Sequence, residues 1–350
     1  MERFQQFSVF IVALIVSMME RHLMMDLAAL LSQSRQTSWN SFGRRIRFYA
    51  PSFTRYQNKS YSAPVNAFPS ISITGNSCGL GCKHCQGKLL QTMIPALTPK
   101  DLLKVARDLS AKGCGGCLIS GGCLPDGSVP LKPFIKTLKQ IKRETKLTIV
   151  IHTGIVKAET ARQLADAGVD EVLIDIIGSD ETIKDIYRLD TTVRDYEASL
   201  EYLEAAKVVF IPHVIVGLHY GRLLGEYTAL EMISRHKPHG LVVIALIPIK
   251  GTPMETSSPP VPEDIARVIA QARIVMPKTP IALGCMRPVG AHRATTDILA
   301  IDAGINGIAF PSEEGIQHAE ALGLATSFSP TCCCQVFDDF RKGFFESNNQ

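Results

Sequence analysis

Three cysteines fall within eight positions of the chain, in the stretch SCGLGCKHCQG (residues 77–87): Cys78, Cys82 and Cys85. A structural zinc site normally takes four protein ligands, and a disulfide framework is typical of much smaller secreted chains. Three thiolates can instead hold three irons of a [4Fe–4S] cluster and leave the fourth iron open to a small molecule. A zinc knuckle completed by His84 is the alternative, but His84 stands between ligating cysteines and would strain to close the same tetrahedron.

The composition is that of an ordinary globular protein. The 350 residues are 46% hydrophobic and 20% charged, which suits one large domain or two small ones. The net charge is only +4, and the densest basic run is GRRIRFY (residues 43–49), so we expect no nucleic-acid partner. The ten cysteines fall in local groups, a pattern typical of metal ligation in a reducing compartment. We therefore expect a cytoplasmic location.

The N-terminal segment contains an apolar run, Phe7 to Met19, of 13 residues. A membrane-spanning helix needs about 20 residues. The run has the length of a signal-peptide core, but Glu2 precedes it and no small-residue cleavage site follows. The next stretch, MERHLMMDLAALLSQ (residues 19–33), predicts an amphipathic helix.

From Ser70 onward, short β-branched runs alternate with helical stretches. Most runs are apolar without alternation, as expected of strands buried on both faces of a parallel sheet. One helix has Thr98 as a candidate N-cap, Pro99 in its first turn and Gly113 after its end. The predicted strands cover residues 70–75, 117–122, 147–154, 171–178, 208–217, 241–249, 280–284 and 306–312.

Eight strands alternating with helices predict an α/β fold, a (β/α)8 TIM-type barrel. An open doubly wound sheet has the same alternation and is the alternative. The predicted organisation is an N-terminal helical extension (residues 1–66), the barrel (67–323) and a C-terminal cysteine-bearing tail (324–350).

Chemistry in TIM-type barrels lies at the carboxyl ends of the strands. The first three cysteines follow the first strand, and Cys123 and Cys285 follow the second and seventh strands. A further run, TCCCQ, stands on the tail. We therefore expect Cys123, Cys285 and two cysteines of that run, Cys333 and Cys334, to hold an auxiliary cluster above the rim. A surface redox pair or a labile tail is the alternative.

Two more cysteines, Cys114 and Cys117, precede or begin the second strand. A strand advances about 3.3 Å per residue, so these thiols should lie at the opposite end of the barrel from Cys123. Because cysteine is also a common buried small hydrophobe, we expect them to be structural.

The spacing CxxxCxxC directly after the first barrel strand resembles the signature of the radical S-adenosylmethionine (SAM) superfamily. The resemblance implies that the amino and carboxylate groups of SAM bind the open iron. Electron transfer, from a donor of the ferredoxin or flavodoxin type, then cleaves SAM to methionine and a 5′-deoxyadenosyl radical that abstracts hydrogen from the substrate.

The same resemblance implies positions that contact SAM. His84 would flank the adenine, and the turn of Gly121 and Gly122 would receive the amino group, because glycine permits close backbone approach. Gly217 in VIVGLHYG and Thr252 in IPIKGTP would lie beside the adenine.

Polar residues at other strand ends have two readings. His152 and Asp175 would face SAM or substrate, or would cap the barrel as satisfied polar groups. Arg287 resembles a barrel arginine near the auxiliary cluster of biotin synthase and would contact substrate. A surface salt bridge is the alternative for Arg287.

Beyond the signature, FGRRIRFYAPSFTRY and FPSISITGNSCGLGCKHCQGKLL resemble the biotin-synthase-like branch. Within it, HTGIV, GLHYG and GCMRP resemble the archaeal-type, two-protein lipoyl synthases. That resemblance implies sulfur insertion at C–H positions of a protein-bound acyl chain, with an auxiliary cluster as sulfur source. The implied partners are an acyl-carrying protein and a second radical SAM protein.

Some features depart from these families. The third strand ends in IVIHTG without the cysteine found there in biotin synthase, and no cysteine precedes Cys78, unlike in single-protein lipoyl synthases. A radical SAM methylase or mutase therefore remains an alternative. A non-catalytic iron–sulfur or zinc protein is another.

Overall fold

The computed structural model describes residues 25–52, 55–59, 61–64 and 67–341. Its strands are β1 Arg45–Tyr49, β2 Ser70–Ser72, β3 Ile94–Pro95, β4 Gly116–Ser120, β5 Thr148–His152, β6 Glu171–Asp175, β7 Phe210–Val216, β8 Leu241–Ala245, β9 Ile281–Leu283, β10 Gly307–Ala309 and β11 Ala325–Ser329. Its α-helices are α2 Leu27–Phe42, α3 Pro99–Ala111, α4 Ile135–Glu144, α5 Ala158–Ala167, α6 Asp180–Thr182, α7 Val193–Ala205, α8 Glu226–Ser234, α9 Pro262–Val275, α10 Ala291–Asp302, α11 Glu313–Ala321 and α12 Val336–Arg341. Short helical turns are η1 Lys88–Thr92, η2 Lys132–Phe134, the π-helical η3 Ile183–Tyr187 and η4 Cys333–Gln335.

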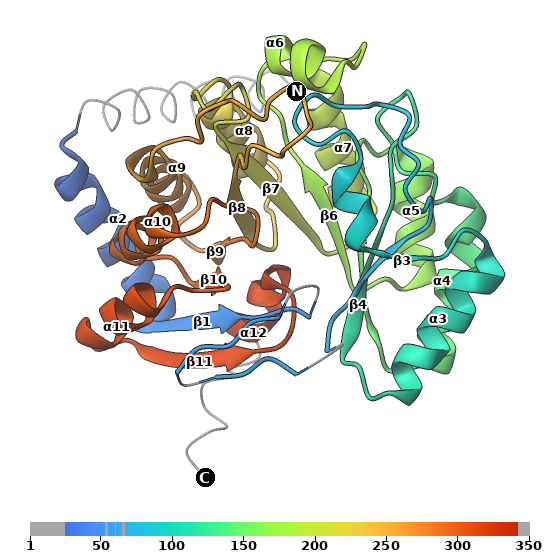
Figure 1. Ribbon diagram of the computed structural model, residues 1–350, viewed down its shortest axis with the longest axis horizontal. Coiled ribbons are helices and arrows are strands. Elements are labelled where there is room, and N and C mark those ends of the chain that lie inside the picture. Colours follow the sequence, from blue (N-terminus) through green and yellow to red (C-terminus); the bar gives the residue numbers. More distant parts are fainter. Residues whose placement is uncertain (1–24, 53–54, 60, 65–66, 342–350) are drawn as a thin grey trace, which may run out of the picture.

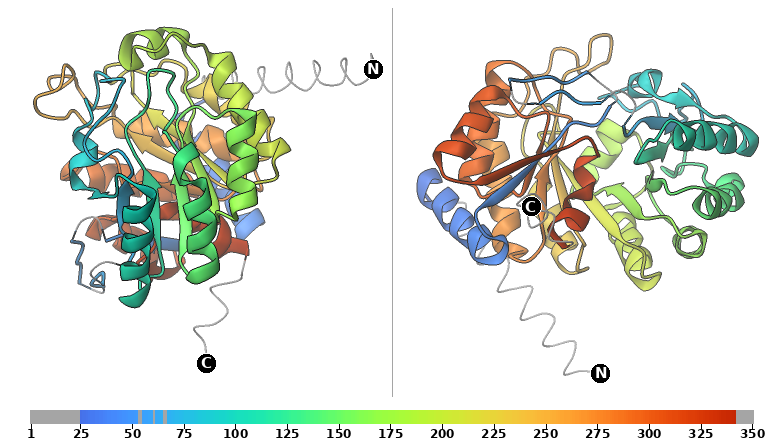
Figure 2. Two further views of the ribbon diagram at one scale, coloured as in Figure 1. Left: turned by 90° about the vertical axis from the view of Figure 1, so that its right-hand side faces the viewer. Right: turned by 90° about the horizontal axis from the view of Figure 1, so that it is seen from below.

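All these strands form one parallel sheet in the order β11-β1-β10-β9-β8-β7-β6-β5-β4-β2-β3. The eight predicted strands correspond to β2 and to β4 through β10, and helices cover the outer face of the curled sheet (Figures 1 and 2). The α/β, TIM-type class is therefore confirmed. Within the described ranges no strand pairing joins β11 to β3, so the barrel is open along that side.

Alternation along each strand separates two apolar layers. Ile149 and Ile151 of β5 belong to the layer between sheet and helices. Val150 between them belongs to the layer inside the barrel, together with Leu173 of β6 and Ile211 of β7. This two-residue period determines which side chains reach the barrel interior.

Two strands come from outside the predicted barrel segment. β1 lies between β10 and β11, with Arg47 opposite Gly307 on one side and Ser327 on the other. The region predicted as an extension and the region predicted as a tail thus share a sheet with the barrel. Seen from below, α12 lies across the lower opening (Figure 2, right).

The tail is held there by polar contacts. Asp339 of α12 accepts hydrogen bonds from Arg47 Nε at 3.1 Å and from the Tyr49 hydroxyl at 2.8 Å. Arg47 is 2% exposed and Tyr49 is fully buried, so these contacts join the tail to buried side chains of β1.

The start of one helix agrees with the prediction and the start of another differs from it. Thr98 and Asp101 form a reciprocal capping box at the start of α3. The N-terminal helix, predicted over residues 19–33, instead begins after Asp26, whose carboxylate accepts from Ala28 N, and continues to Phe42. The apolar run from Phe7 to Met19 lies outside the described residues. No helix in the described part of the chain is long and apolar enough to cross a membrane.

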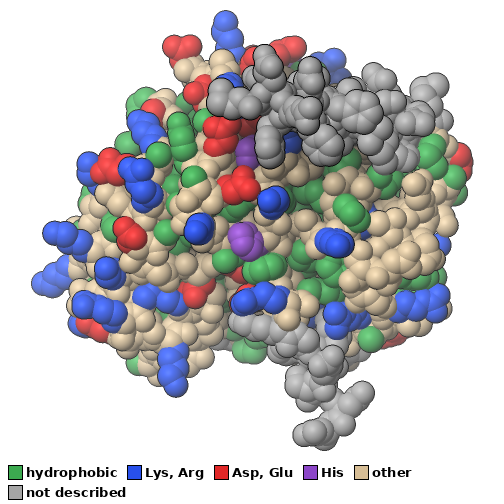
Figure 3. Space-filling view, turned by 180° about the vertical axis from the view of Figure 1, so that it is seen from behind, with side chains coloured by type: hydrophobic (Ala, Val, Ile, Leu, Met, Phe, Trp, Pro, Cys, Tyr) green, Lys and Arg blue, Asp and Glu red, His purple; other side chains and the backbone are tan. Residues whose placement is uncertain are grey.

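Charged side chains of both signs are interspersed on the face opposite to that of Figure 1 (Figure 3). This distribution agrees with the weak net charge of +4.

Candidate active site

The signature loop carrying Cys78, Cys82 and Cys85 follows β2 at the carboxyl end of the sheet. Backbone hydrogen bonds fix the loop on both sides. Lys83 N donates to Ile186 O at 2.9 Å, and Gly79 N donates to Cys123 O at 2.7 Å. The loop coils tightly because positive φ angles occur at three positions, Gly81, Gln86 and Gly87.

The glycine pair after β4 makes room for this loop. A Cβ on Gly122 would lie 2.0 Å from Ser77 O and 2.6 Å from the Cα of Cys78. Gly122 N also donates to Thr74 Oγ1 at 2.7 Å. A Cβ on Gly121 would meet Thr74 at 3.0 Å. The glycines are thus required for packing of the signature loop itself.

The three signature thiols interact with one another. A hydrogen bond from Cys82 lowers the pKa of Cys85, with further lowering by the neighbouring His84. The hydrogen bond with Cys85, burial and nearby Cys78 raise the pKa of Cys82. Thiolate charge is therefore favoured at Cys85. Cys82 is 5% exposed and the other two are half-buried, so the loop presents three clustered sulfurs, a donor set that fits a cluster with one open iron.

Two buried polar groups beside these thiols have no partner within the described chain. They are His84 Nδ1 and the Tyr187 hydroxyl, whose rings lie 5.2 Å apart. Unpaired buried polar groups are costly, so their presence here fits a polar ligand such as SAM. Tyr187 ends the π-helical η3, and sequence periodicity carried no signal for it.

A second polar group lies on three adjacent strands. His152 Nε2 is 3.3 Å from Asp175 Oδ1, and the rings of His152 and His213 are 5.6 Å apart. Asp175 pairs directly with His213 in the β6–β7 register. The structure thus brings the predicted residues His152 and Asp175 together. His213 was not predicted as a member of this group, although it is the one polar residue in the otherwise apolar run FIPHVIVG.

Charge in this group is set by burial and pairing. Burial lowers the pKa of His213 to about 4, so its imidazole is neutral. Burial also lowers the pKa of His152, but the Asp175 carboxylate outweighs burial and the net shift is upward. Burial raises the pKa of Asp175, and His152 reverses that shift to give a lowered value.

A second group of thiols lies inside the barrel: Cys285 after β9 and the run Cys332–Cys334 at η4. The run packs against β8, β9 and β10. Hydrogen bonds from Cys333 and Cys334 lower the pKa of Cys332, while burial and the nearby Cys332 raise the pKa of Cys285 to about 12. The tail was predicted to fold over the upper rim; it enters the interior instead and continues into α12 below.

Cys123 does not belong to this second group. Burial and the neighbouring Cys78 raise the pKa of its thiol to about 12, with smaller effects from Asp175 and Cys85. The predicted four-cysteine set is therefore divided: Cys285, Cys333 and Cys334 come together, and Cys123 lies beside the signature loop. β5, β6, β7 and β8 lie between β4 and β9 in the sheet, so the ends of these two strands lie on different sides of the upper rim.

Cys114 and Cys117 lie at the amino end of β4, as expected. Cys117 is fully buried in the layer between sheet and helices, facing away from the barrel interior. Burial and the nearby Cys114 raise the pKa of Cys117 to about 12. This environment suits a structural role.

The substrate contact predicted for Arg287 is wrong. Its side chain is 0% exposed and forms an ion pair with Asp297 at 2.9 Å. It also donates to Gly284 O, Ala309 O and Phe310 O. These contacts use all five N–H groups of the guanidinium, so none remains for a substrate.

Two further predicted SAM contacts have packing roles. A Cβ on Gly217 would lie 2.7 Å from the Pro260 ring, and its φ is +72°. Thr252 is 5% exposed and donates its hydroxyl to Ile249 O at 2.8 Å. Both residues shape loops at the carboxyl end of the barrel, and their polar groups are satisfied within the chain.

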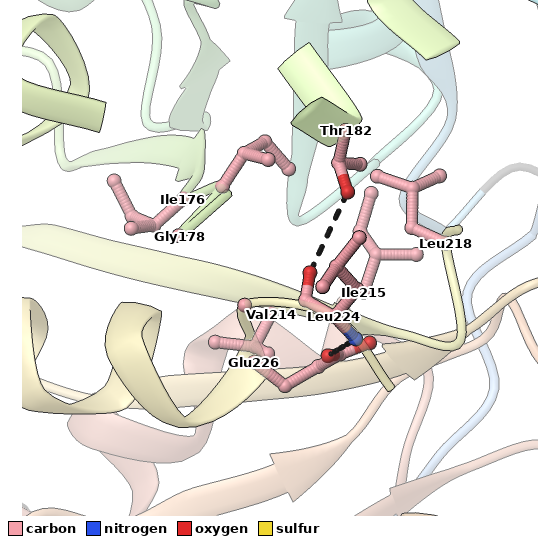
Figure 4. Close-up of a pocket in the computed structure, with 10 residues that line it drawn as sticks. Ile176, Gly178, Thr182, Val214, Ile215, Leu218, Leu224 and Glu226 are labelled. Atoms are coloured by element: carbon pink, nitrogen blue, oxygen red, sulfur yellow. Dashed lines mark hydrogen bonds between the residues drawn. The ribbon is translucent and has the colours of Figure 1, made fainter. Parts of the chain in front are cut away.

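A small pocket, lined by apolar side chains together with Thr182 and Glu226, lies between the ends of β6 and β7 (Figure 4). Leu224 N donates to Glu226 Oε2 at 2.6 Å, and Gly217 N donates to Oε1 at 2.8 Å. Thr182 Oγ1 donates to Leu224 O at 3.5 Å. The Glu226 carboxylate thus holds the loop after β7, and both of its oxygens are engaged.

Comparison with known proteins agrees with this geometry. Residues 72–221 match the model of the radical SAM superfamily, and residues 243–338 match the Biotin and Thiamin Synthesis associated domain. The fold is similar to that of methylornithine synthase, with 15% identity, a TM-score of 0.59, and coverage of 88% of this chain and 93% of that one. It is also similar to the FeFe-hydrogenase maturase of Carboxydothermus hydrogenoformans, with 15% identity, a TM-score of 0.58, and coverage of 97% and 84%.

Two similar curated proteins are biotin synthases. That of Buchnera aphidicola (subsp. Acyrthosiphon pisum, strain APS) is 29% identical over 255 residues, covering 68% of this chain and 70% of the relative. That of Vibrio vulnificus (strain YJ016) is 28% identical over 266 residues, covering 73% and 72%. The chain carries a radical SAM domain followed by a Biotin and Thiamin Synthesis associated domain. In sequence it is similar to the biotin synthases within the radical SAM superfamily.

Proposed function

We propose that this enzyme inserts sulfur into C–H bonds of an acyl chain, in the manner implied by its resemblance to the archaeal-type, two-protein lipoyl synthases. One observation carries the proposal. A second group of four thiols, Cys285 with Cys332–Cys334, lies inside the barrel and is separate from the signature thiols. Four thiolates are the number that fill the ligand positions of a [4Fe–4S] cluster.

Two groups of residues in the barrel would carry out the two parts of the reaction, SAM cleavage and sulfur supply. Cys78, Cys82 and Cys85 would hold the SAM cluster, which when loaded supplies the electron that cleaves SAM. The unpartnered His84 Nδ1 and Tyr187 hydroxyl would bind polar groups of SAM. The thiols of the second group would hold an auxiliary cluster as the sulfur source. An acyl chain admitted between them would be shielded from water by the apolar strands.

The partners follow from this proposal. An acyl chain carried on a protein would reach the interior through the carboxyl end of the barrel, where the signature loop opens. A second radical SAM protein would share the two sulfur insertions, and a ferredoxin- or flavodoxin-type protein would supply electrons.

Iron and sulfide analysis tests the proposal. Anaerobically reconstituted protein should contain about eight irons per chain if two [4Fe–4S] clusters form. Cys285→Ser with Cys333→Ser should remove about four irons and leave reductive SAM cleavage intact. The matched control Cys114→Ser with Cys117→Ser should leave iron unchanged.

A substrate assay completes the test. With SAM, reductant and an octanoyl-lysine peptide, the wild type should form a thiolated peptide, and the Cys285/Cys333 variant should form 5′-deoxyadenosine without thiolation. If iron is unchanged by Cys285→Ser and Cys333→Ser, the enzyme has a single cluster. A radical SAM methylase or mutase then becomes the better assignment.

A further inference from the structure

The interior of the barrel contains a group of ligand atoms that the radical SAM chemistry does not require. His152 of β5, Asp175 of β6 and His213 of β7 each offer one ligand atom, and the three atoms lie within 4.8 Å of one another. The three residues stand on adjacent strands and not on loops, so their positions are fixed by the sheet.

We propose that His152, Asp175 and His213 bind a divalent transition-metal ion of the Zn²⁺ type inside the barrel. Two imidazoles with one carboxylate and an open position form a set that such ions favour. Bonds of about 2.0–2.1 Å at tetrahedral angles place neighbouring ligand atoms about 3.3 Å apart. The His152 Nε2 to Asp175 Oδ1 distance is 3.3 Å, and the ligand atom of His213 lies within 4.8 Å of both other ligand atoms.

The outer contact of His213 is the kind that orients a metal ligand. Its Nδ1 lies 3.2 Å from Ile211 O, so that nitrogen carries the proton and Nε2 keeps its lone pair. Metal-binding histidines commonly donate their second nitrogen to a carbonyl in this way. The side chains of His152 and Asp175 are 25% and 28% exposed, which leaves access for an ion from the interior.

A simple ion pair between His152 and Asp175 does not account for the presence of His213. Pairing His152 with Asp175 would need only one histidine, yet a second imidazole faces the first at 5.6 Å. Both histidines also interact electrostatically with Cys332, and Asp175 interacts with His84 beside the signature loop. The proposed ion therefore lies between the two thiol groups, where its open position could hold a donor atom of the substrate.

Zinc analysis of the cluster-loaded protein tests the site. After equilibrium dialysis against Zn²⁺, the wild type should retain about one zinc per chain in addition to its iron. His152→Ala and His213→Ala should each weaken zinc binding by at least about tenfold, since even changes outside the ligand shell cost that much. Iron content should not change. His239→Ala is the matched control, because His239 packs against Phe210 and Phe337 outside the group.

Cobalt gives a second readout that does not depend on activity. Co²⁺ added to the cluster-loaded wild type should produce visible ligand-field bands, and these bands should be absent from the His213→Ala protein. Zinc that stays bound in both histidine variants but is lost with Cys285→Ser would place the ion on the thiols and overturn the proposal. Absence of zinc from the wild type would overturn it as well. Neither result depends on whether sulfur insertion occurs.

Discussion

Among the signature thiols, Cys82 lies deepest, at 5% exposed, and interacts with both other sulfurs. Replacing Cys82 by Ala should abolish reductive cleavage of SAM, because two thiolates cannot hold the site-differentiated cluster. The measurement is 5′-deoxyadenosine formed with dithionite under anaerobic conditions. Formation at the wild-type rate would mean that the signature does not hold the SAM cluster.

Arg287 offers a contrast, since its role is structural. Removing one partner of a buried ion pair leaves an uncompensated charge, so Arg287→Ala should lower the free energy of unfolding by about 3–5 kcal/mol. Arg194→Ala, which removes solvent-exposed ion pairs with Glu197 and Glu201, should lower the free energy of unfolding far less, because water screens exposed pairs. Urea unfolding of both variants checks this, and equal costs would contradict the burial argument.

Glu171, at the amino end of β6, was missed by sequence reasoning although it shares the two-residue period of Leu173 and Asp175. It is 2% exposed, and its carboxyl group lies beside Cys334 and Gln335 of the tail. Burial raises its pKa well above the ordinary value of 4.5. The group therefore keeps its proton in the folded state at pH values where the unfolded chain has lost it.

The sign of the pH effect follows. Above about pH 4.5 the unfolded state binds fewer protons, so Glu171 reduces stability as pH rises, by up to about 1.4 kcal/mol per pH unit until its folded pKa is reached. Glu171→Gln should be more stable than wild type at about pH 8 and similar at about pH 4. Unfolding in urea at both pH values tests this. The exposed Glu159→Gln should show no such difference, and a variant destabilised at both pH values would contradict it.

At the scale of elements, the turn after β4 determines where the signature loop lies. Gly122→Ala would place a Cβ within 2.0 Å of Ser77 O, so the loop should shift and iron bound by the signature should fall by about half or more. Gly115→Ala is the matched control, because its nearest contact is 4.0 Å away and its φ is not positive. Iron per chain is the measurement; full iron retention in Gly122→Ala would contradict the packing role.

The elements themselves were largely predictable. All eight barrel strands followed from apolar runs between helical patterns, because parallel strands buried on both faces have few polar residues. β1 escaped prediction, since RIRFY contains two arginines and reads as a basic surface run. Arg47 is buried nonetheless, because Asp339, 292 residues later, accepts its hydrogen bond.

The site was predictable in part for a related reason. Cys78, Cys82 and Cys85 are close in sequence, so their spacing alone brings them together. The meeting of Cys285 with the run Cys332–Cys334, and of His213 with Asp175, depends on strand order and on the path of the tail. Position after a strand placed Cys123 on the correct rim but did not determine which neighbours it would have.

At the scale of the molecule, the sheet depends on its last strands. A chain ending at residue 304 would lack β10 and β11, between which β1 pairs. Trypsin should then cleave after Arg45 and Arg47 within the time that leaves the full chain intact, since unpaired segments open readily. Mass spectrometry of a timed digest gives the result. Equal protection in both chains would show that β1 is held by other contacts.

The position of β1 also governs the order of events during synthesis. β1 is synthesised more than 250 residues before either of its partners, since β10 and β11 both follow residue 306. While the ribosome extends the chain, β1 has no place in the growing sheet, and its hydrogen-bonding edges stay available to other strands. Contacts between residues this far apart also slow folding. The final assembly of this edge of the barrel, and enclosure of the second thiol group by the tail, must therefore wait until β10, β11 and the run Cys332–Cys334 have been synthesised.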